Sequence, residues 1–128
     1  LARGNDSIIF TGAVYSEDKE TLLRNAFCFC LPSTIEGLSI ALLEAMAHKL
    51  PVIASDIEAN REVLSVDNAL WVRPENVEDL SDAICSSVSN RQSLFTATEE
   101  NYRLVVNRYT WEKVANEYIR YVNSLKSN

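Results

Sequence analysis

Two short apolar runs, residues 27–31 and 52–54, constrain the fold of this chain more than any other feature. Neither run alternates apolar with polar residues, which is typical of strands in a sheet that is covered on both faces. The segment between them, from about Leu38 to His48, has the apolar spacing of a helix. A strand, a helix and a second strand joined over this length form a right-handed crossover with parallel strands. The sequence therefore predicts an α/β fold built on a parallel sheet.

The other apolar segments continue this alternation, and the few glycines and prolines fall mostly between them. Strands are expected at residues 7–10, 27–31, 52–55 and 70–72, and helices from Ser16, from about Leu38, after a loop that starts at Asp56, from about Val77, from about Gln92 and from about Thr110. Ser16 is expected to cap the first helix, with Leu22 facing inward. We predict one domain, residues 1–128, with a Rossmann-like parallel sheet of about four strands, flanking helices and a helical C-terminal part.

Charge and composition exclude several classes of function. Twelve basic against eighteen acidic residues give a net charge of −6 without any lysine or arginine cluster, so no nucleic-acid partner is expected. No apolar stretch approaches the roughly 20 residues that a membrane span needs. Cys28, Cys30 and Cys85 form no even disulfide set and suit a reducing compartment, and we interpret them as buried structural residues. The chain starts at Leu1, and we interpret it as a piece of a longer protein.

Two glutamates, Glu36 and Glu44, flank the predicted start of the helix that begins at about Leu38. The first N–H groups of a helix have no partner within it and lie at the positive end of its dipole, so this turn suits a phosphate group. Gly37 and Ser39 are small enough to let a diphosphate approach the backbone. Glu44 lies about 7–8 Å past Ser39 along the helix axis, within reach of a nucleotide diol. The alternative interpretation is a solvated loop acid followed by an exposed helix acid.

A longer pattern surrounds the two acids. The run Pro-Ser-Thr-Ile-Glu-Gly-Leu-Ser-Ile-Ala-Leu-Leu-Glu-Ala-Met-Ala at residues 32–47, followed by Pro-Val-Ile-Ala-Ser at 51–55, resembles the donor-site signature of retaining glycosyltransferases of family 4 (group 1), which have the GT-B fold. Phe-Thr-Gly at 10–12, Arg-Glu-Val at 61–63 and Tyr-Thr-Trp-Glu at 109–112 follow the family in the same order. The resemblance covers almost the whole chain.

The resemblance implies that the chain is the C-terminal, nucleotide-sugar-binding half of such an enzyme. Upstream strands and the N-terminal acceptor domain of the same parent chain would then be missing. Glu36 would be the catalytic acid that contacts the donor sugar, and Glu44 would bind the ribose hydroxyls. The implied donor- and phosphate-binding residues are Gly37, Leu38, Ser39, Ile40 and Ala41, and the implied base-flanking residues are Gly12, Ala13 and Val14.

In such an enzyme the substrate is a nucleotide-diphospho-sugar, and the resemblance implies neither a cofactor nor a metal. The implied location is cytoplasmic, with a peripheral position at the inner membrane left open for the parent protein. Transfer in this fold needs a water-poor cleft between two domains and stabilisation of the departing phosphate. The isolated chain supplies one wall of that cleft, so we expect it to be catalytically inactive and to bind the donor weakly.

Three residues depart from the family pattern. Ser39 and Ala59 stand where glycine is common, and Lys49 stands where a glycine usually ends the helix. Lys49 must therefore adopt a left-handed conformation, or the helix must end in another way. Two other functions stay open: a nucleotide-sugar epimerase, and a non-catalytic nucleotide-binding or interaction module of flavodoxin-like type.

The remaining candidate residues are interpreted as structural. His48 is expected to cap a helix end. Arg61 and Glu62 are expected to pair with each other, with contact to the donor as the alternative, and Trp71 is expected to pack in the core. Trp111 is also expected in the core, although the last helix carries an apolar stripe that would be exposed in an isolated chain and favour self-association. The residues of this stripe are Trp111, Val114, Tyr118 and Tyr121.

Overall fold

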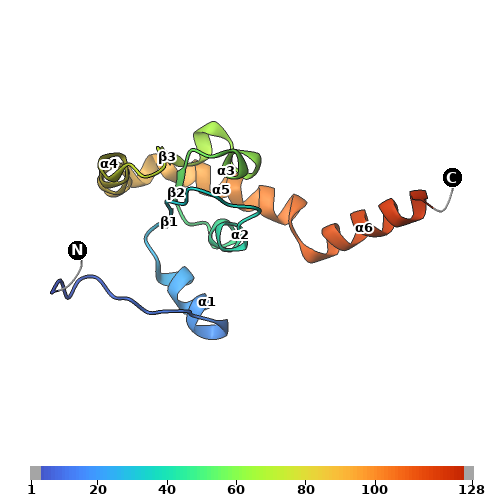
Figure 1. The fold of residues 1–128 in the computed structure, drawn as a ribbon, viewed down its shortest axis with the longest axis horizontal. Coiled ribbons are helices and arrows are strands. Elements are labelled where there is room, and N and C mark those ends of the chain that lie inside the picture. Colours follow the sequence, from blue (N-terminus) through green and yellow to red (C-terminus); the bar gives the residue numbers. More distant parts are fainter. Residues whose placement is uncertain (1–3, 126–128) are drawn as a thin grey trace.

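The computed structural model of the chain describes residues 4–125, apart from the side chains of residues 91–93 and 95. Helices and strands alternate as far as β3, and the described chain beyond it is helical (Figure 1). In chain order the elements are α1 (Ser16–Asn25), β1 (Phe29–Leu31), α2 (Ile40–Ala47), β2 (Val52–Ser55), α3 (Glu58–Val63), the 3₁₀ turn η1 (Val66–Asn68), β3 (Leu70–Val72), α4 (Val77–Ser89), α5 (Arg91–Arg108) and α6 (Trp111–Leu125).

A parallel sheet in the order β1-β2-β3 forms the centre of the fold. Cys30 pairs with Ile53 across β1 and β2, and Ala54 pairs with Trp71 across β2 and β3. β2 lies in the middle, and all its residues are buried, which agrees with the apolar run at residues 52–54. The predicted α/β architecture with a parallel sheet is therefore confirmed.

The prediction of a fourth strand at residues 7–10 is wrong, because the sheet in residues 4–125 has three strands. The segment forms no strand, and Ile9 and Phe10 are 80% and 83% exposed. A strand needs a neighbour to pair with its N–H and C=O groups, and no described strand lies beside this segment.

β1 is an edge strand, because among the described residues it pairs only with β2. Cys30 on β1 and Cys85 on α4 are exposed and Cys28 is half-buried, so the expectation that the three cysteines are buried is wrong.

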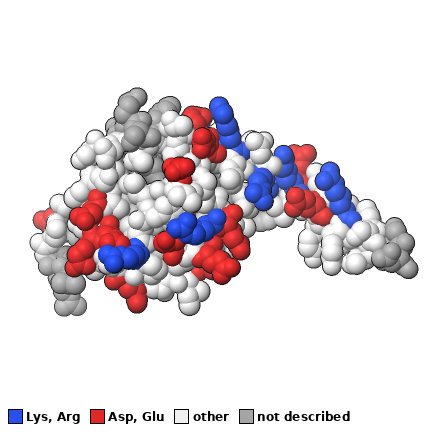
Figure 2. All heavy atoms as spheres, turned by 90° about the horizontal axis from the view of Figure 1, so that it is seen from above, with Lys and Arg blue, Asp and Glu red and all other residues white. Residues whose placement is uncertain are grey.

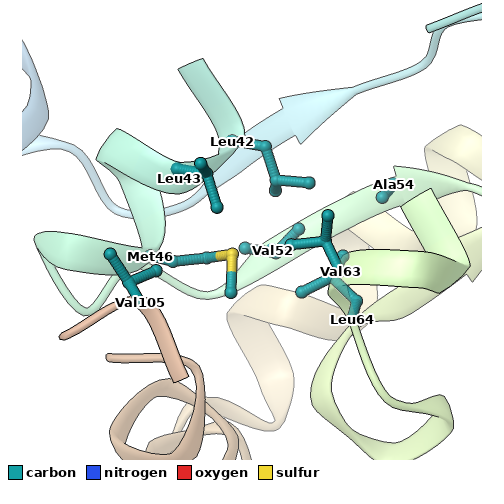
Figure 3. Close-up of a cluster of buried hydrophobic side chains, with 8 residues drawn as sticks. All are labelled: Leu42, Leu43, Met46, Val52, Ala54, Val63, Leu64 and Val105. Carbon is teal, nitrogen blue, oxygen red and sulfur yellow. The ribbon is translucent and has the colours of Figure 1, made fainter. Parts of the chain in front are cut away.

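Helix α2 supplies much of the apolar core on one face of the sheet. Its Leu42, Leu43 and Met46 side chains point towards β2, α5 and the end of α3 (Figure 3). The buried residues that complete this cluster are Val52, Ala54, Val63, Leu64 and Val105. Ile53 points to the opposite face of β2, into a smaller cluster with β3 and α4. The helix whose N-terminus belongs to the candidate site is therefore held by the main core.

Helix α1 lies outside this core. None of its residues is buried, and Leu22 is 52% exposed, so the expectation that it faces inward is wrong. Ser16 does not cap the helix: it is the first helical residue, with φ 49°, and Tyr15 occupies the N-cap position without a side-chain hydrogen bond. With so little apolar burial, α1 depends on polar contacts to α2.

Candidate functional site

Glu36 lies in the loop between β1 and α2, where it is half-buried. The hydroxyl of Ser33 donates a 2.6 Å hydrogen bond to its Oε1 atom. The carboxylate borders a cavity of about 520 Å³, here called the Glu36 cavity, whose lining residues are Thr34, Ile35, Glu36, Gly37, Leu38, Ile57, Glu58, Ala59 and Glu62. These residues follow the carboxyl ends of β1 and β2, which is where open parallel sheets place their ligands.

The turn at Gly37 leaves room for a ligand. A Cβ atom at this position would meet no other atom within 4 Å, so packing within the described chain does not require glycine. Ser39, which stands where the family often has glycine, has an ordinary φ of −74° and is the N-cap of α2. Its Oγ accepts a long 3.4 Å hydrogen bond from the Leu42 N–H group. Serine therefore fits the backbone here, and the departure from the family pattern costs no strain.

Glu44 lies on α2, half-buried, and faces a different hollow. This Glu44 cavity has a volume of about 350 Å³ and is mainly apolar, with lining residues Leu38, Ile40, Leu43, Glu44, Ala47, Val105, Tyr109, Trp111 and Val114. The Nζ atom of Lys19 on α1 lies 2.5 Å from Oε1 of Glu44. The two acids therefore do not share one cavity; Leu38 lines both cavities and lies between them.

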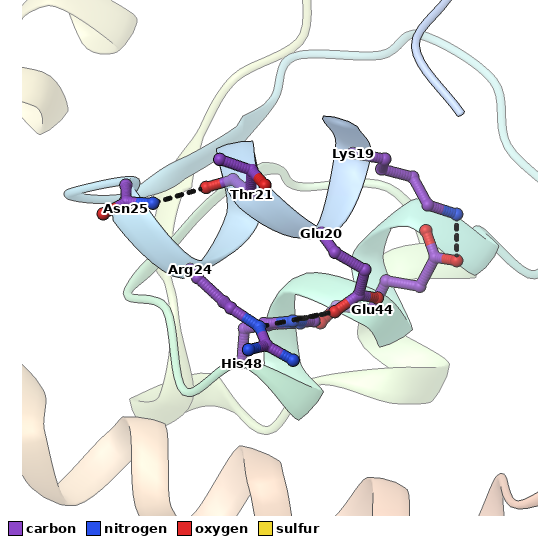
Figure 4. A network of polar contacts seen from close by, with 7 residues as sticks. All are labelled: Lys19, Glu20, Thr21, Arg24, Asn25, Glu44 and His48. Carbon is purple, nitrogen blue, oxygen red and sulfur yellow. Dashed lines mark hydrogen bonds and ion pairs between the residues drawn. The ribbon is translucent and has the colours of Figure 1, made fainter. Parts of the chain in front are cut away.

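The expected base-flanking residues border a third hollow, beside α1. Ala13 and Val14 line this cavity of about 530 Å³, and Gly12 precedes them with a φ of 67° that suits glycine. The loop leads directly into α1, whose Lys19 contacts Glu44 and whose Glu20 contacts the His48 side chain on α2 (Figure 4). The loop at residues 12–14 and Glu44 are thus linked through α1.

The segment from Asp56 to Glu62 differs from its sequence interpretation. Arg61 does not pair with Glu62: it makes two hydrogen bonds to Asp56 and stacks 4.7 Å from the centre of the Trp71 ring. The hydrogen bonds from Arg61 lower the pKa of the Asp56 carboxyl. Trp71 packs at the edge of the main core, as expected, and donates a 2.8 Å hydrogen bond to the Val66 carbonyl.

Sequence reasoning did not identify Glu58 as a site residue or place Glu62 beside Glu36. Both glutamates line the Glu36 cavity. Their four-residue spacing on α3 is the signal that puts them on one helix face. The Glu36 cavity is therefore lined by three carboxylates and by no lysine or arginine.

Basic and acidic side chains are interspersed on the face of the molecule seen in Figure 2. The face seen in Figure 2 shows Asp and Glu gathered on the body of the molecule, with Lys and Arg between them and no continuous basic area. Within residues 4–125 no group of three or more His, Cys, Asp or Glu side chains could hold a metal ion. None of the described helices has both the length and the apolar character to cross a membrane.

The C-terminal end of α2 has Lys49 in place of the glycine that is usual at this position. Lys49 adopts a left-handed φ of 55°, its N–H group donates to the Met46 carbonyl, and the Leu50 N–H group donates to the Ala45 carbonyl. This pair of bonds is a Schellman motif with lysine in the position that glycine prefers. The Nζ atom of Lys49 lies 2.6 Å from Glu99. His48 caps the same end through its ring nitrogen, 2.8 Å from the Glu44 carbonyl, which confirms its expected role.

We expect Lys49→Gly to be about 1 kcal/mol more stable than Lys49→Ala, because only the alanine keeps the steric cost of the left-handed conformation. Both variants lose the ion pair with Glu99 equally, so their difference isolates the backbone effect. Urea unfolding of the two variants measures it. Equal midpoints would show that the helix ends in another conformation in solution.

Helix α6 extends away from the body of the molecule (Figure 1). Trp111 is 84% exposed, so the prediction that it packs in the core is wrong, while the predicted exposure of the stripe is confirmed. The reason is that α6 packs mainly against α5 and has no buried residue. The stripe residues are Trp111, Val114, Tyr118 and Tyr121. Self-association through them stays a prediction.

Comparison with known proteins gives consistent matches. The family model of glycosyl transferases group 1 matches residues 1–90. A phosphatidyl-myo-inositol mannosyltransferase of Mycobacterium leprae is 33% identical over 120 residues, which cover 90% of this chain and 31% of that protein. The C-terminal domain of a glycosyl transferase group 1 family protein from Francisella tularensis superposes with a TM-score of 0.71 and 26% identity, over 84% of this chain and 56% of that one. A sucrose-phosphate synthase from Thermosynechococcus elongatus shares the fold, with a TM-score of 0.77 at 24% identity over 89% of this chain and 30% of that one.

The chain spans between 28% and 31% of the length of four curated relatives that it matches. Its α/β fold matches GT-B glycosyltransferase domains. The family match over residues 1–90 covers most of the chain and includes every residue that the sequence places at the site. On this evidence the chain belongs to the glycosyl transferases group 1 family.

Proposed function

We propose that this chain is the nucleotide-sugar-binding part of a retaining glycosyltransferase of family 4, in which it supplies the donor wall of the active site. The observation that carries the proposal is the position of Glu36 at the Glu36 cavity, beside an open turn at Gly37 and the start of α2. A family match over residues 1–90 supports the reaction class. Sugar transfer from a nucleotide-diphospho-sugar is the activity that this combination fits best.

Each group at the site has a chemical task under this proposal. The diphosphate binds at the start of α2, where backbone N–H groups and the helix dipole favour negative charge. The sugar lies in the Glu36 cavity, and the Ser33 hydroxyl keeps the Glu36 carboxylate in a fixed orientation towards it. Positive charge develops on the sugar ring as its bond to the diphosphate breaks, and a fixed carboxylate stabilises that charge. Glu44, further along α2, accepts hydrogen bonds from the ribose diol.

The separation of the two cavities supports these assignments. Glu36 and Glu44 lie on either side of Leu38, so one ligand that reaches both must be extended and must pass the N-terminus of α2. A nucleotide joined through two phosphates to a sugar has this form, with polyols at both ends and an anion in the middle. A free sugar or a single phosphate would engage one side only.

We expect the chain to bind nucleotide-sugars weakly and Glu44→Ala to weaken that binding at least about tenfold, the size of losing hydrogen bonds to a charged acceptor. Saturation-transfer NMR across uridine, guanosine and adenosine diphospho-sugars measures it. Glu117→Ala, on the exposed α6, is the matched control and should leave binding unchanged.

The same preparation tests for chemistry. Transfer by the 128-residue chain alone is not expected, because one wall cannot exclude water from the reacting sugar. Transfer should appear in the full-length protein. If no nucleotide-sugar binds to either form, the proposal fails, and a module with no role in sugar transfer becomes the better account.

A further inference from the structure

The proposed function assigns no role to the ion pair between Lys19 and Glu44. Lys19 lies on α1, 25 positions before Glu44, and its Nζ atom reaches Oε1 of that carboxylate at 2.5 Å. Both side chains are partly exposed, at 38% and 31%, so a ligand in solvent can reach the pair. The ammonium contacts Oε1, which leaves the second carboxylate oxygen for other hydrogen-bond donors.

The charge of Glu44 creates a difficulty that Lys19 relieves. Glu44 lies about 7–8 Å along the helix axis from the start of α2, where the proposed diphosphate binds, and the chain carries a net charge of −6. Like charges at this distance near a protein surface repel by an amount that matters for binding. An ammonium on Oε1 neutralises the carboxylate while the carboxylate continues to accept bonds from a diol.

Lys19 also fixes the position of α1. This helix has no buried residue, and the Lys19–Glu44 pair and the Glu20–His48 contact of 3.0 Å join it to α2 and its C-terminal end (Figure 4). The loop with Gly12 and Val14 leads into α1, so any shift of the helix moves the loop. The contact with Glu44 therefore sets the distance between the loop and the acid.

We propose that Lys19 is a positioning residue for the nucleotide: it neutralises Glu44 next to the bound diphosphate and holds the loop at Gly12–Val14 at a fixed distance from the ribose. The inference rests on the proposed function, because it needs a nucleotide at Glu44. It predicts that Lys19 acts on nucleotide affinity through Glu44 and has little effect on the reacting sugar.

The test is calorimetric binding of uridine, guanosine and adenosine diphosphates to Lys19→Met in the full-length protein. For the nucleotide that the wild type binds, we expect the affinity to fall about threefold to tenfold, the size of unmasking one like charge at this distance. Lys19→Arg should restore most of the affinity, because it keeps the charge. In transfer assays KM for the donor should rise while kcat stays within about twofold.

Glu20→Gln is the matched control, since it weakens the other contact between α1 and α2 and leaves the Lys19–Glu44 pair in place. It should change the affinity less than twofold. A second control is the 2′,3′-dideoxy form of the same nucleotide. This form has no diol to which Glu44 could bind. The loss of affinity caused by Lys19→Met should therefore be smaller for this nucleotide, because only the repulsion between Glu44 and the diphosphate remains. High salt should remove that remaining loss.

Three results would overturn the inference. One is an unchanged or tighter affinity in Lys19→Met. The second is an equal loss in Glu20→Gln, which would make Lys19 a structural residue of α1. The third is a failure of Lys19→Arg to restore binding. Failure of the proposed function looks different, because the wild type would then bind none of the nucleotides and Glu44→Ala would change nothing.

Discussion

Glu36→Gln is expected to lower kcat for sugar transfer about 100-fold or more in the full-length protein, while nucleotide affinity stays within about threefold. Glutamine keeps the size and the hydrogen bond from Ser33 but loses the negative charge that would stabilise the reacting sugar under the proposed function. Under the proposed function the nucleotide binds at α2 and Glu44, which this change leaves intact. Donor-saturated transfer rates and calorimetry with the bare nucleoside diphosphate separate the two effects.

Glu58→Gln is the matched control for Glu36→Gln. Glu58 lines the same cavity, but its side chain is exposed on α3, so its loss should lower kcat less than about tenfold. Ser33→Ala should have an intermediate effect, since Glu36 then keeps its charge and loses one orienting bond. An active Glu36→Gln variant would remove Glu36 from the chemistry and leave it as a residue of the loop.

Leu42→Ala is expected to lower the free energy of unfolding by about 2–5 kcal/mol. Leu42 is 1% exposed and packs in the main core between α2 and β2, so truncation leaves a cavity that the surrounding side chains cannot fill. Urea unfolding followed by circular dichroism measures the change. Leu22→Ala is the control: this leucine is 52% exposed on α1, and its truncation should cost less than about 1 kcal/mol. Similar losses in the two variants would contradict the core described for α2.

The strands β1, β2 and β3 were predictable because each is mainly apolar and bounded by turn residues, although β1 begins at Phe29 and not at Phe27. The segment at 7–10 has the same local pattern and forms no strand. Strand formation depends on a partner, and a partner is a property of the rest of the chain. The stripe of α6 was recognisable for the same local reason, but periodicity does not say what covers an apolar face, so Trp111 was misplaced.

The candidate site divides in a similar way. The positions of Glu36 and of the N-terminus of α2 could be predicted from the residue spacing and from the family pattern. The left-handed conformation of Lys49 could be predicted because the residue stands where glycine commonly ends a helix. The contact of Lys19 with Glu44 could not be predicted, because an ion pair between two helices depends on how the helices pack and has no local sequence pattern. Arg61 was misread as a partner of Glu62 because Asp56 comes within reach only when the loop folds back.

The contrast between α1 and α2 also sets how each opens to solvent. Amide protons of α2, a helix with four buried residues, exchange with deuterium only when the core itself comes apart. Amide protons of α1, which buries none, exchange through detachment of that helix alone, at a much smaller free energy. A ligand that spans Glu44 and the loop before α1 would slow the second process and leave the first almost unchanged. Glu44 thus stands on a helix whose amide protons exchange slowly, and its partner Lys19 stands on one whose amide protons exchange fast.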